Sequence, residues 1–246
     1  MSDSQTKNID PEIPEDISTE IFIKNWRIYR KIIENDNMSH KEGYAKLREI
    51  LTEEMRRPFS FVDLACGDSY YSSMVLRNTN AAKYIGIDVS EEALSLAKEE
   101  FRDSGIEARF VRADFINFAE FIETPVDVIW VGFSVHHLDT PEKLEFMKNV
   151  RQALSQDGIF MLYEPILLEG EDRGEYFKRF KQIFYMHWKG LSKEEGESLL
   201  EHVRESEKPE TTGDWIMLGK EAGFNQAEKV FSEETGLYEI FKYSSC

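Results

Sequence analysis

Between residues 59 and 163 the chain alternates short apolar stretches with helical patterns, and this alternation is what most constrains its fold. Five apolar stretches bounded by turn residues predict strands at 59–64, 83–88, 108–113, 126–131 and 159–163. Helical patterns fill the intervals, including 70–77, 91–101 and a segment that starts at Thr140-Pro141. Strands that are apolar on both faces and alternate with helices indicate a parallel α/β sheet covered by helices on both faces.

The segments on either side of this alternation add helices and two closing strands. Strands are expected at 227–231 and 237–243, joined by a turn at Thr235-Gly236, as an antiparallel pair at the sheet edge. The expected organisation is a tail at 1–17, helices at 18–56 and an α/β domain at 57–246 with a helical insertion at about 166–212. The helix starts predicted from side-chain caps are Ser39 with Glu42, Ser90, Ser192 with Glu195, and Asp214.

Composition restricts the classes of partner. The net charge is −17 and 41% of the residues are hydrophobic, so the chain has material for a core but repels nucleic acid and anionic membranes. Cys66 and Cys246, the two cysteines, have no metal-ligand spacing and exclude a disulfide scaffold. The polar start of the chain resembles no signal peptide. We therefore expect a cytoplasmic protein with no nucleic-acid or membrane partner.

The turn after the first strand suits a ligand without phosphates. Small residues at Ala65 and Gly67 allow a ligand to approach the backbone closely. The turn lacks both the Gly-x-Gly-x-x-Gly pattern of dinucleotide sites and the Gly-Lys-Ser/Thr of a P-loop, and Asp68 would oppose a pyrophosphate.

Acidic residues end the next two strands. Asp88 lies about 20 residues after the glycine turn, where an acid is placed to bind two ribose hydroxyls. Asp114 ends the third strand, where its carboxylate would accept from an exocyclic amine while Phe115 packs nearby. Together these residues indicate a nucleoside ligand; the alternative is that each acid caps a helix or lies solvated in a loop.

Five segments resemble the motifs of class I S-adenosylmethionine-dependent methyltransferases. They are VDLACG at 62–67, YIGIDVS at 84–90, RADF at 112–115, DVIW to FSVHHL at 127–138 and LSQDGIF at 154–160. The resemblance covers about 57–165 plus the closing strands. It implies a Rossmann-like, seven-stranded, mostly parallel sheet with an antiparallel last strand, and S-adenosylmethionine as cofactor. The cofactor-binding residues that it implies are Asp63, Ala65, Cys66, Gly67, Asp88, Val89, Asp114, Phe115 and Phe133. The chain departs from the family at Ala65 and Ser69, where glycine is frequent.

The fourth strand leads to candidate bases for methyl transfer. Transfer needs a nucleophile held about 3 Å from the sulfonium methyl carbon and kept unprotonated. His137 and His136 are the candidates, with His137 preferred and Asp139 placed to orient one of them. The alternative is that one histidine packs against the sheet and the other caps a loop. Adjacent histidines usually point apart, so no metal site is expected here.

Candidate substrate contacts follow the fifth strand and lie in the helical blocks. Glu164 is placed to bind a substrate amine or a cation, or is simply a solvated acid. Arg173 is placed to pair with Glu164 or with a substrate carboxylate. The family resemblance implies that the helical blocks form a lid over the substrate. The aromatic residues that would line a pocket under it, or belong to the core instead, are Trp26, Tyr29, Tyr44, Tyr176, Phe180 and Trp188.

These observations favour an enzyme that methylates oxygen or nitrogen of a small molecule, acting as a monomer or homodimer. One alternative is a non-catalytic member that binds the cofactor and serves as a regulatory or scaffolding subunit. A third possibility is a protein methyltransferase with a basic partner, which the charge permits. A nicotinamide oxidoreductase is disfavoured by the incomplete glycine pattern.

Overall fold

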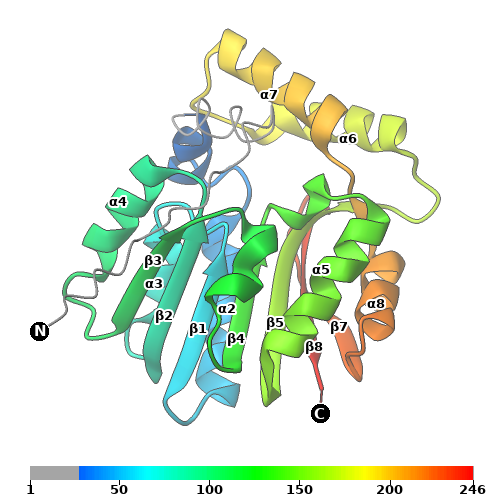
Figure 1. The fold of residues 1–246 in the computed structure, drawn as a ribbon. Helices are drawn as coiled ribbons and strands as arrows, with labels where there is room; N and C mark the ends of the chain where they lie inside the picture. Colours follow the sequence, from blue (N-terminus) through cyan, green and yellow to red (C-terminus); the bar gives the residue numbers. More distant parts are fainter. Residues whose placement is uncertain (1–27, 246) are drawn as a thin grey trace, which may run out of the picture.

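The strands of the alternating region assemble into one sheet in the computed structural model, which describes residues 28–245. Seven strands follow the order β3-β2-β1-β4-β5-β8-β7, and all of them are parallel except β8 (Figure 1). The strands are β1 (Phe59–Leu64), β2 (Ala81–Asp88), β3 (Glu107–Arg112), β4 (Val126–Gly132), β5 (Leu154–Leu167), β7 (Gln226–Ser232) and β8 (Tyr238–Ser244). The predicted Rossmann-like, mostly parallel sheet with an antiparallel last strand is confirmed.

The structure adds two details that the sequence pattern did not predict. A two-residue strand, β6 (Glu210–Thr211), pairs with the end of β5 as an eighth strand. The last strand β8 lies inside the sheet between β5 and β7, so β7 rather than β8 is the edge. Both closing strands form the expected antiparallel pair.

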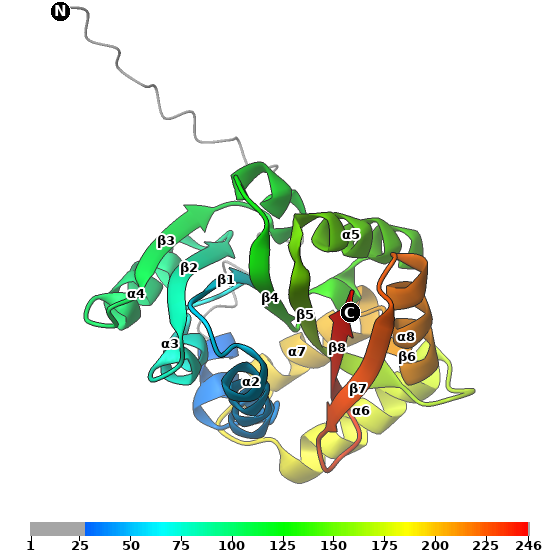
Figure 2. The same cartoon turned by 90° about the horizontal axis from the view of Figure 1, so that it is seen from below.

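Helices cover both faces of the sheet (Figure 2). One layer holds α2 (His40–Glu54), α3 (Tyr70–Leu76) and α4 (Glu91–Phe101), and residues 28–34 are also helical. The opposite layer holds the 3₁₀ helix η1 (Phe115–Phe121), α5 (Thr140–Ala153) and α8 (Thr212–Glu221). Because side chains alternate along a strand, Phe61 enters the core on the first side while its neighbour Val62 enters the core on the other.

Two helices of the insertion lie across the carboxyl ends of the parallel strands. These are α6 (Arg173–His187) and α7 (Lys193–Ser206), which pack on each other at the top of Figure 1. A short 3₁₀ helix, η2 (Val135–His137), links β4 to α5 at the same end of the sheet. Across residues 28–245 no helix has the length and apolar character needed to cross a membrane.

Two of the predicted helix caps are confirmed. Ser90 accepts a hydrogen bond from the backbone N–H of Ala93 at the start of α4 (3.2 Å). Ser192 and Glu195 form the expected capping box of α7.

Two other predicted caps are wrong. Ser39 takes a left-handed backbone (φ 51°) and its side chain caps nothing; the Asp36 carboxylate accepts the Lys41 N–H instead (3.0 Å). At α8 the N-cap is Thr211, and Asp214 is the third helical residue of the capping box, not the cap itself. At α2 Ser39 keeps the N-cap position but the Asp36 side chain supplies the acceptor, whereas at α8 Thr211 supplies both.

Candidate functional site

The loop after β1 turns sharply at three positions. Ala65, Gly67 and Ser69 all have left-handed backbones, with φ of 52°, 54° and 54°. This region favours glycine because a Cβ crowds the following carbonyl. The family departures at Ala65 and Ser69 therefore occur where glycine would be least strained.

Asp88 closes this loop from the neighbouring strand. Its Oδ2 accepts the backbone N–H of Gly67 and its Oδ1 that of Ser90, each at 2.8 Å. Burial raises the pKa of Asp88, although these two hydrogen bonds oppose the shift. Each carboxylate oxygen accepts more than one hydrogen bond, so the side chain keeps acceptor capacity for two adjacent hydroxyl groups. The geometry fits the ribose contact that the sequence predicts.

Asp63 lies beneath the loop with its carboxyl group almost fully buried. Its Oδ2 accepts hydrogen bonds from Ser72 Oγ (2.5 Å) and from the Tyr84 hydroxyl (2.8 Å). Burial raises the pKa of Asp63 to about 7, against the effect of these hydrogen bonds. The carboxyl group therefore changes charge near neutral pH.

The third strand end has a simpler arrangement. The Asp114 side chain caps η1 by accepting the Ile116 N–H (3.1 Å), and the half-buried Phe115 packs on Phe146. Val89 accepts a hydrogen bond from Arg112 through its carbonyl oxygen (3.3 Å). Asp114, Phe115 and Val89 stand at the predicted strand ends, but none of them lines the cavity described next; their role in cofactor binding stays a prediction.

A cavity of about 30 Å³ opens from the loop towards α2 and α3. This volume holds about one water molecule. Of the predicted site residues, the cavity brings together Asp63, Ala65, Cys66, Gly67, Phe133, Tyr29 and Tyr44. Its other lining residues are Ile33, His40, Asp68, Ser69, Tyr70, Tyr71, Trp130 and Gly132.

His40 is a cavity residue that the motif-based reasoning missed. Its side chain is 2% exposed, and neither ring nitrogen has a hydrogen-bond partner. Burial lowers the pKa of His40 to about 3, so the imidazole is neutral at physiological pH. The available signal was its position on the apolar face of the helix that also carries Tyr44 and Leu47, at i+4 and i+7.

Glu164 lies inside the protein, not at the rim. Its side chain is fully buried, and its carboxylate accepts the backbone N–H groups of Ser134 (3.1 Å), Val135 (2.8 Å) and His136 (3.3 Å). It also contacts the His136 ring through Nδ1. Burial disfavours both charged forms: it raises the pKa of Glu164 to about 8 and lowers that of His136. We call these four residues the Glu164 cluster.

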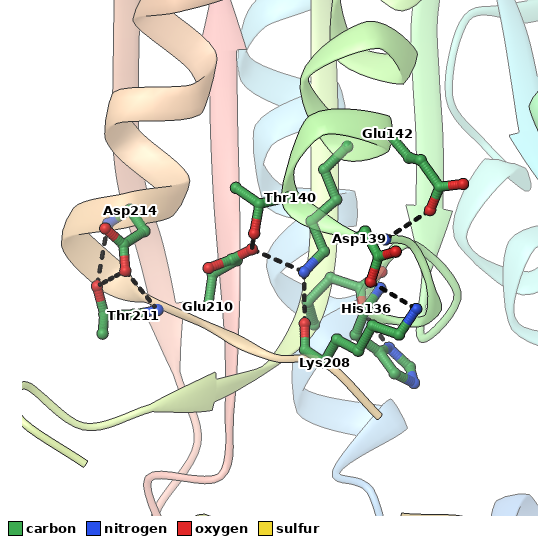
Figure 3. Close-up of polar contacts among 10 residues, drawn as sticks. His136, Asp139, Thr140, Glu142, Lys208, Glu210, Thr211 and Asp214 are labelled. Atoms are coloured by element: carbon green, nitrogen blue, oxygen red, sulfur yellow. Dashed lines mark hydrogen bonds and ion pairs between the residues drawn. The ribbon is translucent and has the colours of Figure 1, made fainter. Parts of the chain in front are cut away.

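Neither expected orienting contact forms. Asp139 starts α5 as its N-cap and pairs with Lys208 (2.8 Å), so it is not directed at a histidine (Figure 3). Arg173 donates to the carbonyl oxygens of Arg204 (3.4 Å) and Glu205 (3.5 Å) instead of pairing with Glu164. Asp139 serves as the N-cap of α5 instead, and Arg173 is held by backbone carbonyl groups at the end of α7.

His137 and the aromatic residues of the insertion lie outside the cavity. His137 Nδ1 is 3.4 Å from the carbonyl oxygen of Ser206 on α7. Tyr176 is buried and donates a hydrogen bond to Glu207 (2.7 Å), and Phe180 packs on Trp188 in the core between the insertion and the sheet. Trp26 lies outside the described residues. Within 28–245, no group of three or more histidine, cysteine, aspartate or glutamate side chains is placed to hold a metal ion.

Comparisons with known proteins agree with this architecture. Residues 61–158 match the family described as "Methyltransferase domain". The carboxy-S-adenosyl-L-methionine synthase of Nautilia profundicola is 25% identical over 197 residues, which cover 78% of this chain and 80% of the relative.

Solved structures show the same fold. The plantazolicin methyltransferase BamL, crystallised with a triazolic desmethylPZN analogue and SAH, superposes with a TM-score of 0.62 at 14% identity, covering 93% of this chain and 96% of that one. A putative O-methyltransferase from Nostoc punctiforme gives a TM-score of 0.59 at 15% identity, covering 82% and 55%. With the strand order, the sharp loop at 65–69 and the acid at Asp88, these matches show the Rossmann-like fold of class I methyltransferases, and residues 61–158 carry a methyltransferase domain.

Proposed function

We propose that this enzyme transfers the methyl group of S-adenosylmethionine to an oxygen or nitrogen atom of a small molecule enclosed at the carboxyl end of the sheet. One observation carries the proposal: a single cavity is lined both by the loop after β1 and by aromatic side chains of α2 and α3. The loop is where the cofactor is expected. Because the cavity holds about one water molecule, it would have to widen to take a small acceptor beside the cofactor, among the aromatic residues.

The residues around the loop fit the cofactor. Asp88 offers acceptor capacity for the ribose hydroxyls, and Asp63 and Asp68 favour a positive charge beside the cavity. Asp114 and Phe115 would contact the adenine. When bound, S-adenosylmethionine supplies a methyl carbon on a positively charged sulfur. The protein's part is to hold the acceptor atom in line with that carbon and to keep water away.

Charge and shape favour a small, non-anionic substrate. Among the described cavity-lining residues there is no lysine or arginine that would pair with an anion, and the net charge of −17 disfavours nucleic acid. Tyr29 and Ile33 close the cavity from helical residues 28–34, and α6 and α7 lie across the same end of the sheet (Figure 1). This position supports a lid role for both helical blocks.

Calorimetric titration with S-adenosylmethionine and S-adenosylhomocysteine tests the cofactor. We expect the wild-type chain to bind both, and Asp88→Ala to bind at least ten-fold more weakly because the ribose acceptors are gone. The matched control is Asp103→Ala, an exposed acid after α4, which should bind as the wild type does. Absence of wild-type binding would exclude the enzyme and leave a scaffolding role.

A substrate screen then separates the remaining alternatives. Turnover of small hydroxyl or amino compounds supports the proposal, and methylation of a basic protein only would replace it with a protein methyltransferase. Binding of cofactor without any turnover would indicate a regulatory subunit. His137→Ala should lose turnover but keep cofactor binding if His137 acts as a base, whereas the positions of His136 and Glu164 suggest roles in support of the loop before α5.

Synthesis of carboxy-S-adenosyl-L-methionine is the second candidate, because relatives of that name align with 78% of the chain. A donor of a carboxyl group would be an anion, for which the described cavity lining offers no cationic side chain. Mass spectrometry of the nucleoside products decides: S-adenosylhomocysteine indicates methyl transfer, and a carboxylated S-adenosylmethionine indicates the synthase reaction.

A further inference from the structure

Tyr84 of β2 lies in the core beneath the loop after β1, and its hydroxyl group reaches that loop. The ring is fully buried and packs on Phe101, with centroids 4.1 Å apart, and on Phe110, at 5.6 Å. The hydroxyl oxygen lies 2.8 Å from Asp63 Oδ2 and 2.8 Å from Ser69 Oγ. A phenylalanine would pack in the same aromatic surroundings, so only the hydroxyl group of Tyr84 links β2 to the loop in this way.

The conformation of Ser69 shows that this contact holds the loop. Ser69 is the N-cap residue of α3, a position where a serine side chain ordinarily accepts a backbone N–H. Here its backbone is left-handed (φ 54°) and its side chain makes no capping bond, because the hydroxyl group lies against Tyr84. The loop therefore forgoes a helix cap and keeps a strained backbone, and the contact with Tyr84 offsets part of this cost.

Asp63 is a buried carboxyl group without a cationic partner among the groups around it. Its hydrogen bonds come from the neutral hydroxyl groups of Ser72 (2.5 Å) and Tyr84, and both reach the same oxygen, Oδ2. None of the described ionisable groups that face it is a cation, since the imidazole of His40 is neutral, so burial disfavours the charge on Asp63. Besides Tyr84, these groups are Tyr29 of residues 28–34, His40 and Tyr44 of α2, Cys66 and Asp68 of the loop, Tyr70 and Tyr71 of α3, and Asp88 of β2.

We propose that Tyr84 is a positioning residue for cofactor binding: its hydroxyl group holds the loop through Ser69 and stabilises the charged form of Asp63 when a positively charged cofactor lies against the loop. This inference rests on the proposed function, because it requires S-adenosylmethionine to bind beside this loop. Tyr84 does not line the cavity, so it acts through Ser69 and Asp63 and not by contact with the cofactor.

The two hydroxyl groups act on Asp63 in the same direction. The hydrogen bonds from Ser72 and Tyr84 oppose the effect of burial, which still raises the pKa of Asp63 to about 7. Because a hydroxyl group carries one proton, Tyr84 can donate to the carboxylate while it accepts from Ser69. A positively charged sulfur beside the loop favours the carboxylate further, so binding of S-adenosylmethionine should release the proton of Asp63 to the solvent.

Calorimetry in buffers of different ionisation enthalpy measures this proton. At pH 7 about half of the free protein is protonated at Asp63, so the wild type should release about 0.5 proton more than Asp63→Asn on binding S-adenosylmethionine. Asp63→Asn is the reference because it removes this titration, while protons from the cofactor's own groups are common to both proteins. Equal release by the two proteins would contradict the inference.

Two variants separate the carboxyl group from the loop contact. Ser69→Ala loses only the contact with the loop and should bind S-adenosylmethionine about three-fold more weakly than wild type at both pH 7 and pH 9. Tyr84→Phe loses the same contact and also a donor to Asp63, so the pKa of Asp63 rises further. It should bind about five-fold more weakly than Ser69→Ala at pH 7, and within two-fold of it at pH 9, where Asp63 is charged in both.

Ser72→Ala repeats the test without changing the sheet. It removes the other donor to Asp63 and should bind about five-fold more weakly than wild type at pH 7 but within two-fold at pH 9. Two buried hydroxyl groups serve as controls and should bind as the wild type does at both pH values. Ser73→Ala is the neighbour on α3, whose hydroxyl donates to the Tyr70 carbonyl oxygen (2.9 Å), and Tyr243→Phe lies on β8, where its hydroxyl donates to the Trp215 carbonyl oxygen (3.2 Å).

Each remaining outcome decides the question. Binding by Tyr84→Phe that equals that of Ser69→Ala at both pH values, wild-type binding by Ser69→Ala, or unfolding of both Tyr84→Phe and Ser72→Ala would overturn the inference and leave the proposed function standing. If Tyr84→Phe alone failed to fold, an equal loss in Ser72→Ala at pH 7 and pH 9 would overturn it too. Failure of the wild type to bind S-adenosylmethionine at either pH would instead overturn the proposed function.

Discussion

Two buried histidines near the same end of the sheet differ in almost every contact. His136 is 4% exposed, its ring contacts the Glu164 carboxylate, and its carbonyl oxygen accepts the Lys208 N–H (2.8 Å). His40 is 2% exposed, and neither of its ring nitrogens has a partner. Burial lowers the pKa of both, so burial alone does not distinguish their roles.

The difference lies in how hydrogen-bonding capacity is used. In the Glu164 cluster, three backbone N–H groups and the His136 imidazole use the hydrogen-bonding capacity of the Glu164 side chain. The cluster therefore fixes η2 against β5. In the cavity, the imidazole of His40 is surrounded by ring faces. A saturated polar group stabilises the fold, whereas an unsaturated one beside a cavity has capacity left for a ligand.

Removing the carboxylate of Glu164 should have the largest effect on this comparison. Glu164→Ala leaves three buried N–H groups and the His136 ring without an acceptor. We expect a loss of about 3 to 5 kcal/mol in the free energy of unfolding, measured by urea denaturation. The control Glu169→Ala, on the exposed loop after β5, should stay within about 0.5 kcal/mol of wild type. If Glu164→Ala cost under about 1 kcal/mol, the cluster would not be a structural support.

The pH dependence of stability tests Asp63, which lines the cavity. Its pKa is about 7 in the folded protein against 3.8 for the ordinary group, so the folded state binds more protons between these values. The contribution of Asp63 to the free energy of unfolding is therefore most favourable at low pH and falls as pH rises from about 4 to 7. Asp63→Asn carries no such charge, and we expect it to gain about 2 to 4 kcal/mol relative to wild type between pH 4 and pH 8.

Denaturation at each pH measures this gain, with Asp103→Asn as an exposed control that should follow the wild type. A constant difference between Asp63→Asn and wild type would show that the buried carboxyl does not titrate in this range. Asp63→Asn should also bind S-adenosylmethionine more weakly, because it removes a negative charge beside the cavity.

Lys143 on α5 is a second buried ionisable group whose hydrogen-bonding capacity is used by other groups of the protein. Its ammonium donates to Glu210 Oε1 (2.8 Å) and to the carbonyl oxygen of Lys208, and it lies 5.4 Å from the Trp215 ring centroid. Lys143→Met keeps the side-chain volume but leaves these acceptors unpaired. Thermal and urea unfolding should show a loss of about 2 kcal/mol, while Lys148→Met, at a half-buried position of the same helix with its side chain 43% exposed, should change little. If Lys143→Met left the free energy of unfolding unchanged, apolar packing alone would stabilise this part of α5.

The parts that the sequence predicted well depend on local patterns. The bounds of β1 follow from a short apolar run, and both β1 and α4 were predicted to the residue. The place of Asp88 beside the loop follows from its distance to the glycine turn. The loop strain at Ala65 was visible only as a departure from the family's glycine.

The parts that were missed depend on tertiary contacts. Glu164 reads as a rim acid because it follows the predicted strand 159–163, yet β5 continues to Leu167 and η2 folds over Glu164 and supplies its N–H groups. Ser39 reads as a cap, but Tyr163 donates to the carbonyl oxygens of Met38 and Ser39 (3.0 and 3.3 Å), in a turn where Ser39 adopts a left-handed backbone. His40 follows directly, and its enclosure by α3 and by Phe133, the residue after β4, could not be inferred from spacing along α2.

Of these variants, Ala65→Gly should change the free energy of unfolding least. It tests the backbone of the loop that lines the cavity. Relief of the left-handed backbone at Ala65 favours glycine by about 1 kcal/mol or more, while glycine's greater freedom in the unfolded chain takes back part of this gain. We expect a net stabilisation of about 0.5 kcal/mol by urea denaturation, with cofactor binding kept. Ala97→Gly, buried within α4, should instead lose about 1 kcal/mol. If Ala65→Gly destabilised the fold as much as Ala97→Gly does, the loop would gain more from the alanine methyl group against the cavity than it loses to backbone strain.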